Sequence, residues 1–304
     1  MARRCNVRGC EGSAPRVFQL ILPSVGDSRI TLASAEMPHR FFSTARGPLV
    51  FAHRGGSGLA PENTLAAFDS GFAAGADGLE LDVHLSRDGI VVVHHDRTLD
   101  RTTNLAGPVV ACTAAELARA DAGHRFQRED GRFFRGQGIG VPTLSEVLVR
   151  YRDVPIIVEL KVNSPELAQA AVGVVRRADA VDRVCIGSDG LRALQEVRAV
   201  EPAIATSAAR EEVRWALYRS WVRWPVRHAA YGGYQVPEYA GRARVVSPRF
   251  VEMSHRAELA VQAWTVDTAE DALRLLGWGV DALITDRPDV IVPVVRTWNR
   301  SSRS

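Results

Sequence analysis

Short apolar segments alternate with amphipathic segments along most of this chain, and this alternation limits its fold more than any other feature. Eight apolar segments have the pattern of strands, and they begin near residues 49, 79, 155, 183, 203, 234, 260 and 281. Strands that alternate with helices pair in parallel through right-handed crossovers. The pattern predicts an α/β fold, a (β/α)8 TIM barrel, with an open doubly wound sheet as the alternative.

The alternation also sets the expected boundaries of the barrel, residues 47–295. Residues 1–46 show no sustained period and are predicted to be a disordered leader, with a targeting peptide or a translation start at Met37 as alternatives. Residues 296–304 are predicted to be a flexible tail. Residues 97–143 interrupt the pattern after the second strand, and long insertions of this kind are often substrate walls.

Composition excludes several classes of protein. The 304 residues are 46% hydrophobic and 24% charged, which is ordinary for a soluble globular protein, and no apolar run is long enough to span a membrane. A net charge of +3 gives no basis for nucleic-acid binding. Four cysteines without a C-x-x-C pair fit a reducing compartment and predict a cytoplasmic protein. The sequence does not indicate an oligomeric state.

The first strand ends in His53-Arg54-Gly55-Gly56. Reactive side chains of a barrel belong at the C-terminal ends of its strands. The two glycines allow backbone N–H groups to approach an anion, and arginine carries a fork of donors suited to phosphate oxygens. This end therefore indicates an anion site, with a turn around a buried histidine as the alternative.

Acidic residues occur at the ends of the next two strands. Side chains alternate along a strand, so Glu80, Asp82 and His84 share one face, as do Glu159 and Lys161, the only lysine of the chain. An inward set of three carboxylates predicts a divalent cation, Mg²⁺ or Ca²⁺ with Mn²⁺ as a further option. The alternatives are a solvent-facing polar strand, and a simple ion pair between Glu159 and Lys161.

A second histidine follows the short strand that begins at Ile90 and returns by a tight turn. Alternation directs His95 toward the same rim and His94 toward the opposite face. Two histidines beside a cation and an arginine suit general acid and base catalysis near neutral pH. A structural role for either ring is the alternative.

Taken in order, these motifs resemble the glycerophosphodiester phosphodiesterase family. The resemblance rests on ordered matches from about residue 50 to residue 290: His53-Arg54-Gly55-Gly56, Ala60-Pro61-Glu62-Asn63-Thr64, Leu79-Glu80-Leu81-Asp82-Val83, His95-Asp96, Leu99-Asp100-Arg101-Thr102-Thr103, Val141-Pro142-Thr143-Leu144, Val158-Glu159-Leu160-Lys161, Ala263-Trp264-Thr265-Val266-Asp267 and Leu283-Ile284-Thr285-Asp286-Arg287-Pro288. Each match is modest alone, and the ordered set is specific. The family's fold is a (β/α)8 barrel with an insertion after the second strand.

The resemblance implies the reaction and its main groups. The substrate is expected to be a small-molecule glycerophosphodiester, hydrolysed to glycerol 3-phosphate and an alcohol. Glu80, Asp82 and Glu159 are expected to hold the divalent cation, and His53 and His95 to act as general base and general acid. The glycerol 2-hydroxyl is expected to attack first, giving a cyclic phosphate that water opens.

Other positions follow from the same resemblance. Arg54 and Lys161 are expected to hold the phosphate charge, and Trp264 to contact the substrate. Glu62 is expected to orient the loop after His53 or to support the metal ligands, with a surface position as the alternative. The family often has asparagine where Asp267 stands, which predicts an extra acid near the substrate.

Two other functions fit the same residues. One is a lysophospholipase D-like phosphodiesterase that acts on lipid substrates with the same chemistry. The other is a phosphodiester-binding barrel that has lost catalysis, although all the reactive positions are present in this chain.

The helix expected over residues 210–224 goes beyond the common pattern. Leu217, Tyr218, Trp221 and Trp224 fall on one side of it, opposite Arg219 and Arg223. This stripe favours packing of an outer helix on the barrel, and transient contact with a membrane surface is the alternative.

Overall fold

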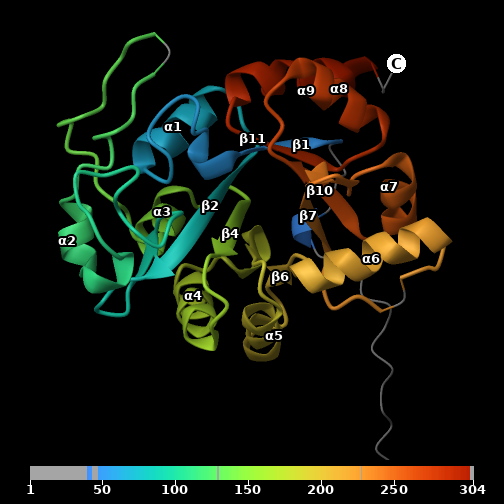
Figure 1. Ribbon diagram of the computed structural model, residues 1–304, viewed down its shortest axis with the longest axis horizontal. Helices are drawn as coiled ribbons and strands as arrows, with labels where there is room; N and C mark the ends of the chain where they lie inside the picture. The colour runs from blue at the N-terminus through green and yellow to red at the C-terminus, as the bar shows by residue number, and fades with distance from the viewer. Residues whose placement is uncertain (1–39, 43–46, 129, 227, 302–304) are drawn as a thin grey trace, which may run out of the picture. The chain divides into compact units, whose positions relative to one another are not determined.

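Eight parallel strands form a ring in the computed structural model, which describes residues 40–42, 47–128, 130–226 and 228–301 (Figure 1). Their order is β6-β5-β4-β2-β1-β11-β10-β7, and one parallel bridge between Ser207 and Gly233 joins β6 to β7. The closed ring confirms the predicted barrel and excludes the open sheet.

The strands of the ring are short, and a helix follows each of them. The ring strands are β1 (Leu49–Ala52), β2 (Gly78–Leu85), β4 (Ile156–Leu160), β5 (Val184–Gly187), β6 (Ala205–Thr206), β7 (Gly233–Pro237), β10 (Ala260–Trp264) and β11 (Ala282–Thr285). The helices around them are α1 (Leu65–Ala73), α3 (Leu144–Arg150), α4 (Pro165–Arg177), α5 (Leu191–Val200), α6 (Arg210–Val222), α7 (Pro248–His255), α8 (Ala269–Gly277) and α9 (Pro288–Ser301). None of the described helices is long and apolar enough to cross a membrane.

Local sequence fixes where several of these helices begin. The Thr64 hydroxyl accepts a hydrogen bond from the Ala67 N–H at 3.2 Å at the start of α1. Thr143 and Glu146 cap each other's backbone N–H groups at the start of α3. Such a cap is worth about 1 kcal/mol. The caps end the loops that follow the strands, and these loops carry the functional side chains.

The barrel interior is layered along the strands. Below the C-terminal ends of the strands the inward side chains form an apolar cluster that includes Phe51, Ile157 and Ile284. Phe41 and Phe42 belong to the same cluster. Gly232 leaves room for the Phe42 ring, because a Cβ at this position would overlap it. Among the described residues, most polar inward side chains therefore lie toward the C-terminal ends, and buried Gln262, which accepts a hydrogen bond from Gln235, is an exception.

Two predicted boundaries need correction. Phe41 and Phe42 are 6% and 5% exposed, so these two residues of the predicted leader pack against the barrel. The rest of the leader lies outside the described residues. At the other end, α9 continues to Ser301, and Trp298 packs on the core. The predicted tail therefore does not begin at residue 296, because the last turns of an amphipathic helix cover the barrel there.

The insertion after β2 has a core of its own. The short strand β3 (Val91–Val93) pairs antiparallel with β2, and α2 (Ala114–Ala118) follows within the insertion. The buried residues of this cluster are Val92, Leu99, Val109, Leu117, Ala122 and Val141. A second departure from the simple alternation lies after β7, where the chain forms a hairpin of β8 (Tyr239–Ala240) and β9 (Ala243–Arg244).

Candidate active site

A cavity of about 670 Å³ opens at the C-terminal ends of the strands. Most of the predicted site residues line it: His53, Arg54, Glu80, His95, Glu159, Lys161 and Trp264. Asp82 and Glu62 do not line the cavity, but both form ion pairs with Arg54, and Asp82 also pairs with Lys161. The rule that reactive groups gather at this end of a barrel therefore holds here.

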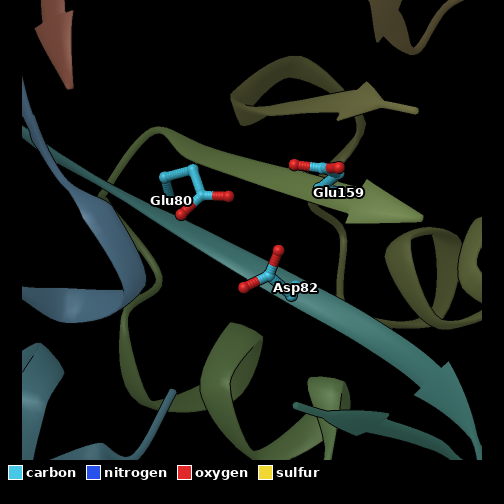
Figure 2. A group of neighbouring side chains, drawn as sticks. All are labelled: Glu80, Asp82 and Glu159. Carbon is cyan, nitrogen blue, oxygen red and sulfur yellow. The ribbon is translucent and has the colours of Figure 1, made fainter. Parts of the chain in front are cut away.

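Three carboxylates converge on one point from β2 and β4 (Figure 2). One oxygen each from Glu80, Asp82 and Glu159 lies within 4.8 Å of the others. The register explains this, since Asp82 and Glu159 are directly paired across the two strands. Such a set of hard oxygen donors suits a divalent cation.

The electrostatics of this cluster also fit a cation. Burial and the adjacent Asp82 carboxylate raise the pKa of Glu80 to about 8. Burial and the same carboxylate raise the pKa of Glu159, although Lys161 opposes the shift from 3.1 Å. Like charges held together away from water are costly unless a proton or a cation intervenes. The cluster therefore favours binding of positive charge.

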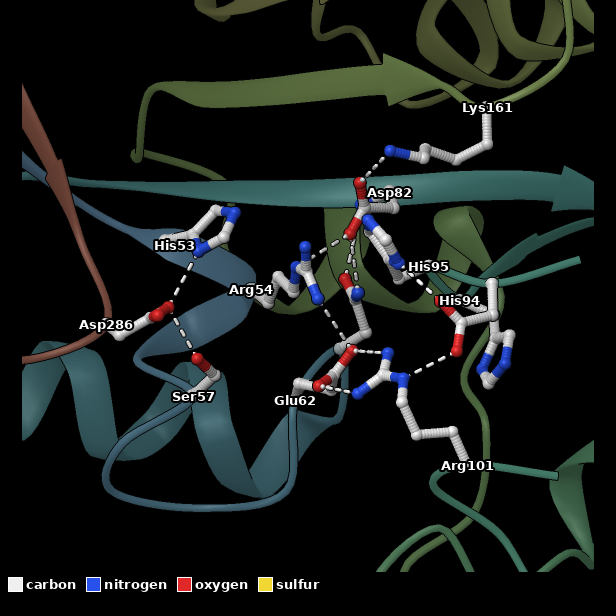
Figure 3. A network of polar contacts seen from close by, with 12 residues as sticks. His53, Arg54, Ser57, Glu62, Asp82, His94, His95, Arg101, Lys161 and Asp286 are labelled. Carbon is white, nitrogen blue, oxygen red and sulfur yellow. Dashed lines mark hydrogen bonds and ion pairs between the residues drawn. The ribbon is translucent and has the colours of Figure 1, made fainter. Parts of the chain in front are cut away.

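His53 is held by a carboxylate from the last strand of the ring. Its Nδ1 donates a hydrogen bond to Asp286 Oδ1 at 2.7 Å, and Ser57 donates to the same oxygen (Figure 3). Its Nε2 lies 3.8 Å from Glu80 Oε2. Burial would lower the pKa of His53, but Glu80 and Asp286 outweigh it and raise this pKa to about 9. The ring thus presents Nε2 to the cavity.

His95 has a similar arrangement on the other side. Its Nδ1 donates to Asp96 Oδ1 at 2.6 Å, and its carbonyl accepts a hydrogen bond from buried His84 at 3.0 Å. His94 instead bonds the Thr98 carbonyl and does not line the cavity. The predicted opposite orientation of the two neighbouring histidines is therefore confirmed.

Arg101 connects the two sides of the site. Its guanidinium donates two hydrogen bonds of 2.7 Å to Glu62 and a third, of 2.5 Å, to Asp96 (Figure 3). Glu62 in turn lies 3.0 Å from Arg54 Nη1. A chain of ion pairs thus runs from Arg54 to the partner of His95, and Glu62 lies inside it rather than at the surface.

Arg54 and Lys161 flank the acidic cluster. Arg54 Nε lies 3.4 Å from Asp82 Oδ2, and Lys161 Nζ lies 3.4 Å from Asp82 Oδ1. Asn63 donates a hydrogen bond of 2.8 Å to Asp82 Oδ2. Burial would lower the pKa of Lys161, but the carboxylates of Glu159 and Asp82 raise it, so the ammonium group stays charged.

Four of these residues had no role predicted from the sequence: Asp286, Asp96, Arg101 and Asn63. All of them stand in the matched motifs, but none was assigned a contact. Side-chain alternation could have predicted that Asp286 points inward, because it stands two residues after the inward Ile284 of β11. The other three lie on loops, where alternation gives no direction.

Two expectations about the surroundings of the site are wrong. Asp267 does not line the cavity, and its Oδ1 accepts hydrogen bonds from the Thr285 hydroxyl at 2.9 Å and the Asp286 N–H at 2.8 Å. It fixes the end of β11 and thereby Asp286. The insertion is not a cavity wall either, since none of its described residues lines the cavity. Its contribution is the side chain of Arg101.

The helix predicted over residues 210–224 is α6, which ends at Val222, and the two interpretations of it can be distinguished in the structure. Leu217 is buried against the barrel. Tyr218, Trp221 and Trp224 are 45%, 54% and 65% exposed. Packing of the helix on the barrel therefore does not explain why these positions are aromatic. Tyr218 and Trp221 line the far part of the cavity instead.

Comparisons with known proteins agree with this geometry. The family model described as "Glycerophosphoryl diester phosphodiesterase family" matches residues 53–290. A curated relative from Caldanaerobacter subterraneus, named glycerophosphodiester phosphodiesterase, is 35% identical over 253 residues, covering 82% of this chain and 98% of the relative.

Two solved structures share the fold. A glycerophosphodiester phosphodiesterase from Agrobacterium tumefaciens is 29% identical with a TM-score of 0.67, covering 81% of this chain and 99% of that one. An Oleispira antarctica phosphodiesterase in complex with the product sn-glycerol-3-phosphate is 29% identical with a TM-score of 0.66, covering 82% of this chain and 97% of that one. The chain belongs to the glycerophosphoryl diester phosphodiesterase family of hydrolases.

Proposed function

We propose that this chain hydrolyses glycerophosphodiesters to glycerol 3-phosphate and an alcohol, with a divalent cation and two histidines. One observation carries the proposal: three clustered carboxylates, two carboxylate-bound histidines and the side chains of Arg54 and Lys161 meet at a single cavity. The solved Oleispira antarctica relative, which binds sn-glycerol-3-phosphate as product, supports the identity of the glycerol half.

Glu80, Asp82 and Glu159 would hold the cation, Mg²⁺ or Ca²⁺, with Mn²⁺ as a further option. The donor set fits, because all three ligands are oxygens and the raised pKa of Glu80 reflects an acidic site that positive charge would relieve. When bound, a divalent cation supplies positive charge to the phosphate oxygens and favours attack on phosphorus.

The two histidines would transfer the protons. His53 takes the proton of the glycerol 2-hydroxyl as that oxygen bonds to phosphorus, and His95 gives a proton to the alkoxide that leaves. Water then opens the resulting cyclic phosphate, with the roles reversed. Asp286 and Asp96 hold Nδ1 of each ring, which leaves Nε2 for this transfer. Neutralising Glu80 would lower the His53 pKa toward the range in which the ring accepts a proton.

Arg54 and Lys161 would neutralise the phosphate oxygens as negative charge builds up on them. Trp264, which is 39% exposed in the cavity wall, would contact the substrate beside them. Glu62 would support this group through Arg54. We also propose a cytoplasmic location, since the thiols of Cys112 and Cys185 are both free.

A panel of diesters with and without EDTA tests the proposal. We expect glycerol 3-phosphate to be released from glycerophosphocholine and glycerophosphoethanolamine, EDTA to abolish the release, and added Mg²⁺, Ca²⁺ or Mn²⁺ to restore it. Full activity after exhaustive chelation would remove the cation from the proposal. Binding of these diesters without turnover under any metal would instead support the non-catalytic barrel.

A further inference from the structure

Two buried histidines take no part in the proposed reaction. His84 is 2% exposed on β2, His94 is 5% exposed just after β3, and neither ring lines the cavity. Burial lowers the pKa of both rings, so each is neutral at pH 7 and has one N–H to donate. Both lie next to His95. Because neither ring reaches the cavity, any influence on the reaction must pass through the residues that they hold.

His84 holds the backbone of His95. Its Nε2 donates a hydrogen bond of 3.0 Å to the His95 carbonyl, and within the described part of the chain the backbone of His95 makes no other hydrogen bond. Pairing with β2 does not fix this backbone, since His95 lies beyond the end of β3. The same strand, β2, carries Glu80 and Asp82. The bond from His84 therefore ties the backbone of His95 to the strand that carries two of the proposed cation ligands.

His94 closes the loop that carries His95 and its partner Asp96. The His94 N–H donates a hydrogen bond of 2.9 Å to the Asp82 carbonyl, which anchors the near end of the loop on β2. Its ring Nε2 donates a hydrogen bond of 3.1 Å to the Thr98 carbonyl at the far end. Thr98 is in turn bridged to the insertion. The loop is thus held at both ends, and His95 and Asp96 lie between them.

We propose that His84 and His94 are positioning residues for His95, the general acid of the proposed function, on which this inference rests. They hold the His95 ring where it reaches the oxygen that leaves phosphorus. In that step the bond from phosphorus to the alcohol oxygen breaks, and this oxygen keeps the electron pair and takes the proton of His95 Nε2. The glycerol 2-hydroxyl oxygen bonds to phosphorus and gives its proton to His53.

The choice of leaving group separates the positioning of an acid from a general loss of structure. The alkoxide of choline needs a proton as it leaves, whereas p-nitrophenolate leaves without one, so only the first reaction depends on a well-placed acid. Alcohol release is measured from glycerophosphocholine and from the p-nitrophenyl ester of glycerol 3-phosphate. A saturating excess of protein over substrate limits the measurement to a single turnover, and hence to the step that releases the alcohol.

His84→Met and His94→Met remove the two N–H donors and keep an apolar side chain of similar size. We expect each to slow choline release by roughly 10- to 100-fold, as for a small misplacement of a reacting group, and nitrophenol release by less than about threefold. The nitrophenol reaction still needs the cation, Arg54 and Lys161, so its rate shows whether the rest of the site is intact.

Two conservative variants test the hydrogen bond itself. His84→Gln places an amide N–H donor within reach of the His95 carbonyl and should restore most of the choline rate. His84→Asn is polar but too short to reach this carbonyl, so we expect it to behave like His84→Met. The pair also gives the comparison if the methionine variant does not fold.

His95→Ala sets the upper limit of the effect, and choline release should fall by roughly 10²–10⁴-fold while nitrophenol release falls much less. His255→Met is the control, since its ring pairs with Asp281 away from the cavity, and it should change neither rate.

Equal losses with both alcohols in the methionine variants would reduce His84 and His94 to a structural role and overturn the inference. Unchanged choline release, or equal rates for His84→Gln and His84→Asn, would overturn it as well. If His95→Ala slows both alcohols equally, the acid role of His95 in the proposed function is wrong. No alcohol release by the unaltered protein refutes the proposed reaction itself.

Discussion

The two ends of the barrel interior are built from opposite kinds of residue. Below the site, the inward side chains of β1, β4 and β11 are Phe51, Ile157 and Ile284. Two residues further along the same segments the side chains at the site are His53, Glu159 and Asp286. Side-chain alternation has a period of two, so one strand supplies packing at one end and chemistry at the other.

Substitutions at the two ends should therefore cause different kinds of loss. At the apolar end, removing a buried ring leaves a cavity and destabilises the fold. At the polar end, buried like charges already oppose folding, so removing one of them should cost activity without costing stability. The following predictions test this division, beginning with the largest effect.

Glu80→Gln should cause the largest loss of activity. The variant keeps the size of the side chain but removes one ligand charge from the acidic cluster, and we expect turnover to fall by roughly 10³-fold or more. The melting temperature of the metal-free protein should not fall, because below pH 8 this buried carboxyl already holds a proton and glutamine is a neutral group of the same size. Glu116→Gln, in the insertion, is the control. A large fall in melting temperature for Glu80→Gln would contradict the division.

His53→Ala and His95→Ala should each lower kcat by roughly 10²–10⁴-fold, the usual contribution of a general acid or base. Both rings lie at strand ends, so the free energy of unfolding should change little. His255→Ala is the control, since its ring pairs with Asp281 away from the cavity. If either active-site variant is as active as the unaltered protein, the proton-transfer role of that ring is wrong.

Phe42→Ala should show the reverse pattern. Its ring is 5% exposed among the apolar residues at the bottom of the barrel, and its loss should cost about 3–5 kcal/mol of unfolding free energy. The kcat/KM of the folded variant should stay close to that of the unaltered protein. Phe133→Ala, at a residue that is 59% exposed, is the matched control for denaturant unfolding. Equal stability of the two variants would show that Phe42 does not hold the bottom of the barrel.

Alternation explains how much of the site the sequence could predict. It directed Glu80, Asp82 and Glu159 inward without knowledge of any contact, since direction along a strand depends only on position. The ring of strands then brought these side chains together. The same reasoning, applied to β11, would have found Asp286.

The rest of the site depends on contacts between distant segments. His53 and Asp286 are 233 positions apart, and Arg101 reaches Glu62 across 39 positions. No periodicity encodes such pairs. Phe41 and Phe42 were missed for a different reason, because one turn of helix is too short to show a period.

Metal binding should become tighter as the pH rises, because the Glu80 carboxyl loses its proton. Burial and Asp82 raise its pKa to about 8, so below this pH a proton competes with the cation, and above it the carboxylate is free. Affinity for Mg²⁺ should rise with pH by up to about tenfold per unit below pH 8 and then level off. Calorimetric titration of the unaltered protein measures this without turnover. An affinity for Mg²⁺ that stays constant as the pH rises toward 8 would contradict the raised pKa of Glu80.

Arg101→Lys should have the smallest effect, and it tests whether the polar end is one connected unit. The guanidinium fork bonds Glu62 and Asp96 together, and a lysine cannot reproduce this geometry. Because the Arg101 side chain is half-exposed and such pairs are worth up to about 1 kcal/mol, we expect kcat to fall by roughly fivefold. Arg87→Lys alters a comparable exposed ion pair with Glu116 and should leave kcat unchanged. An increase in KM alone would indicate that Arg101 acts in substrate binding. A decrease in kcat would instead indicate that Arg101 positions His95 through Asp96. In that case a loop of the insertion completes the site formed by the strand ends.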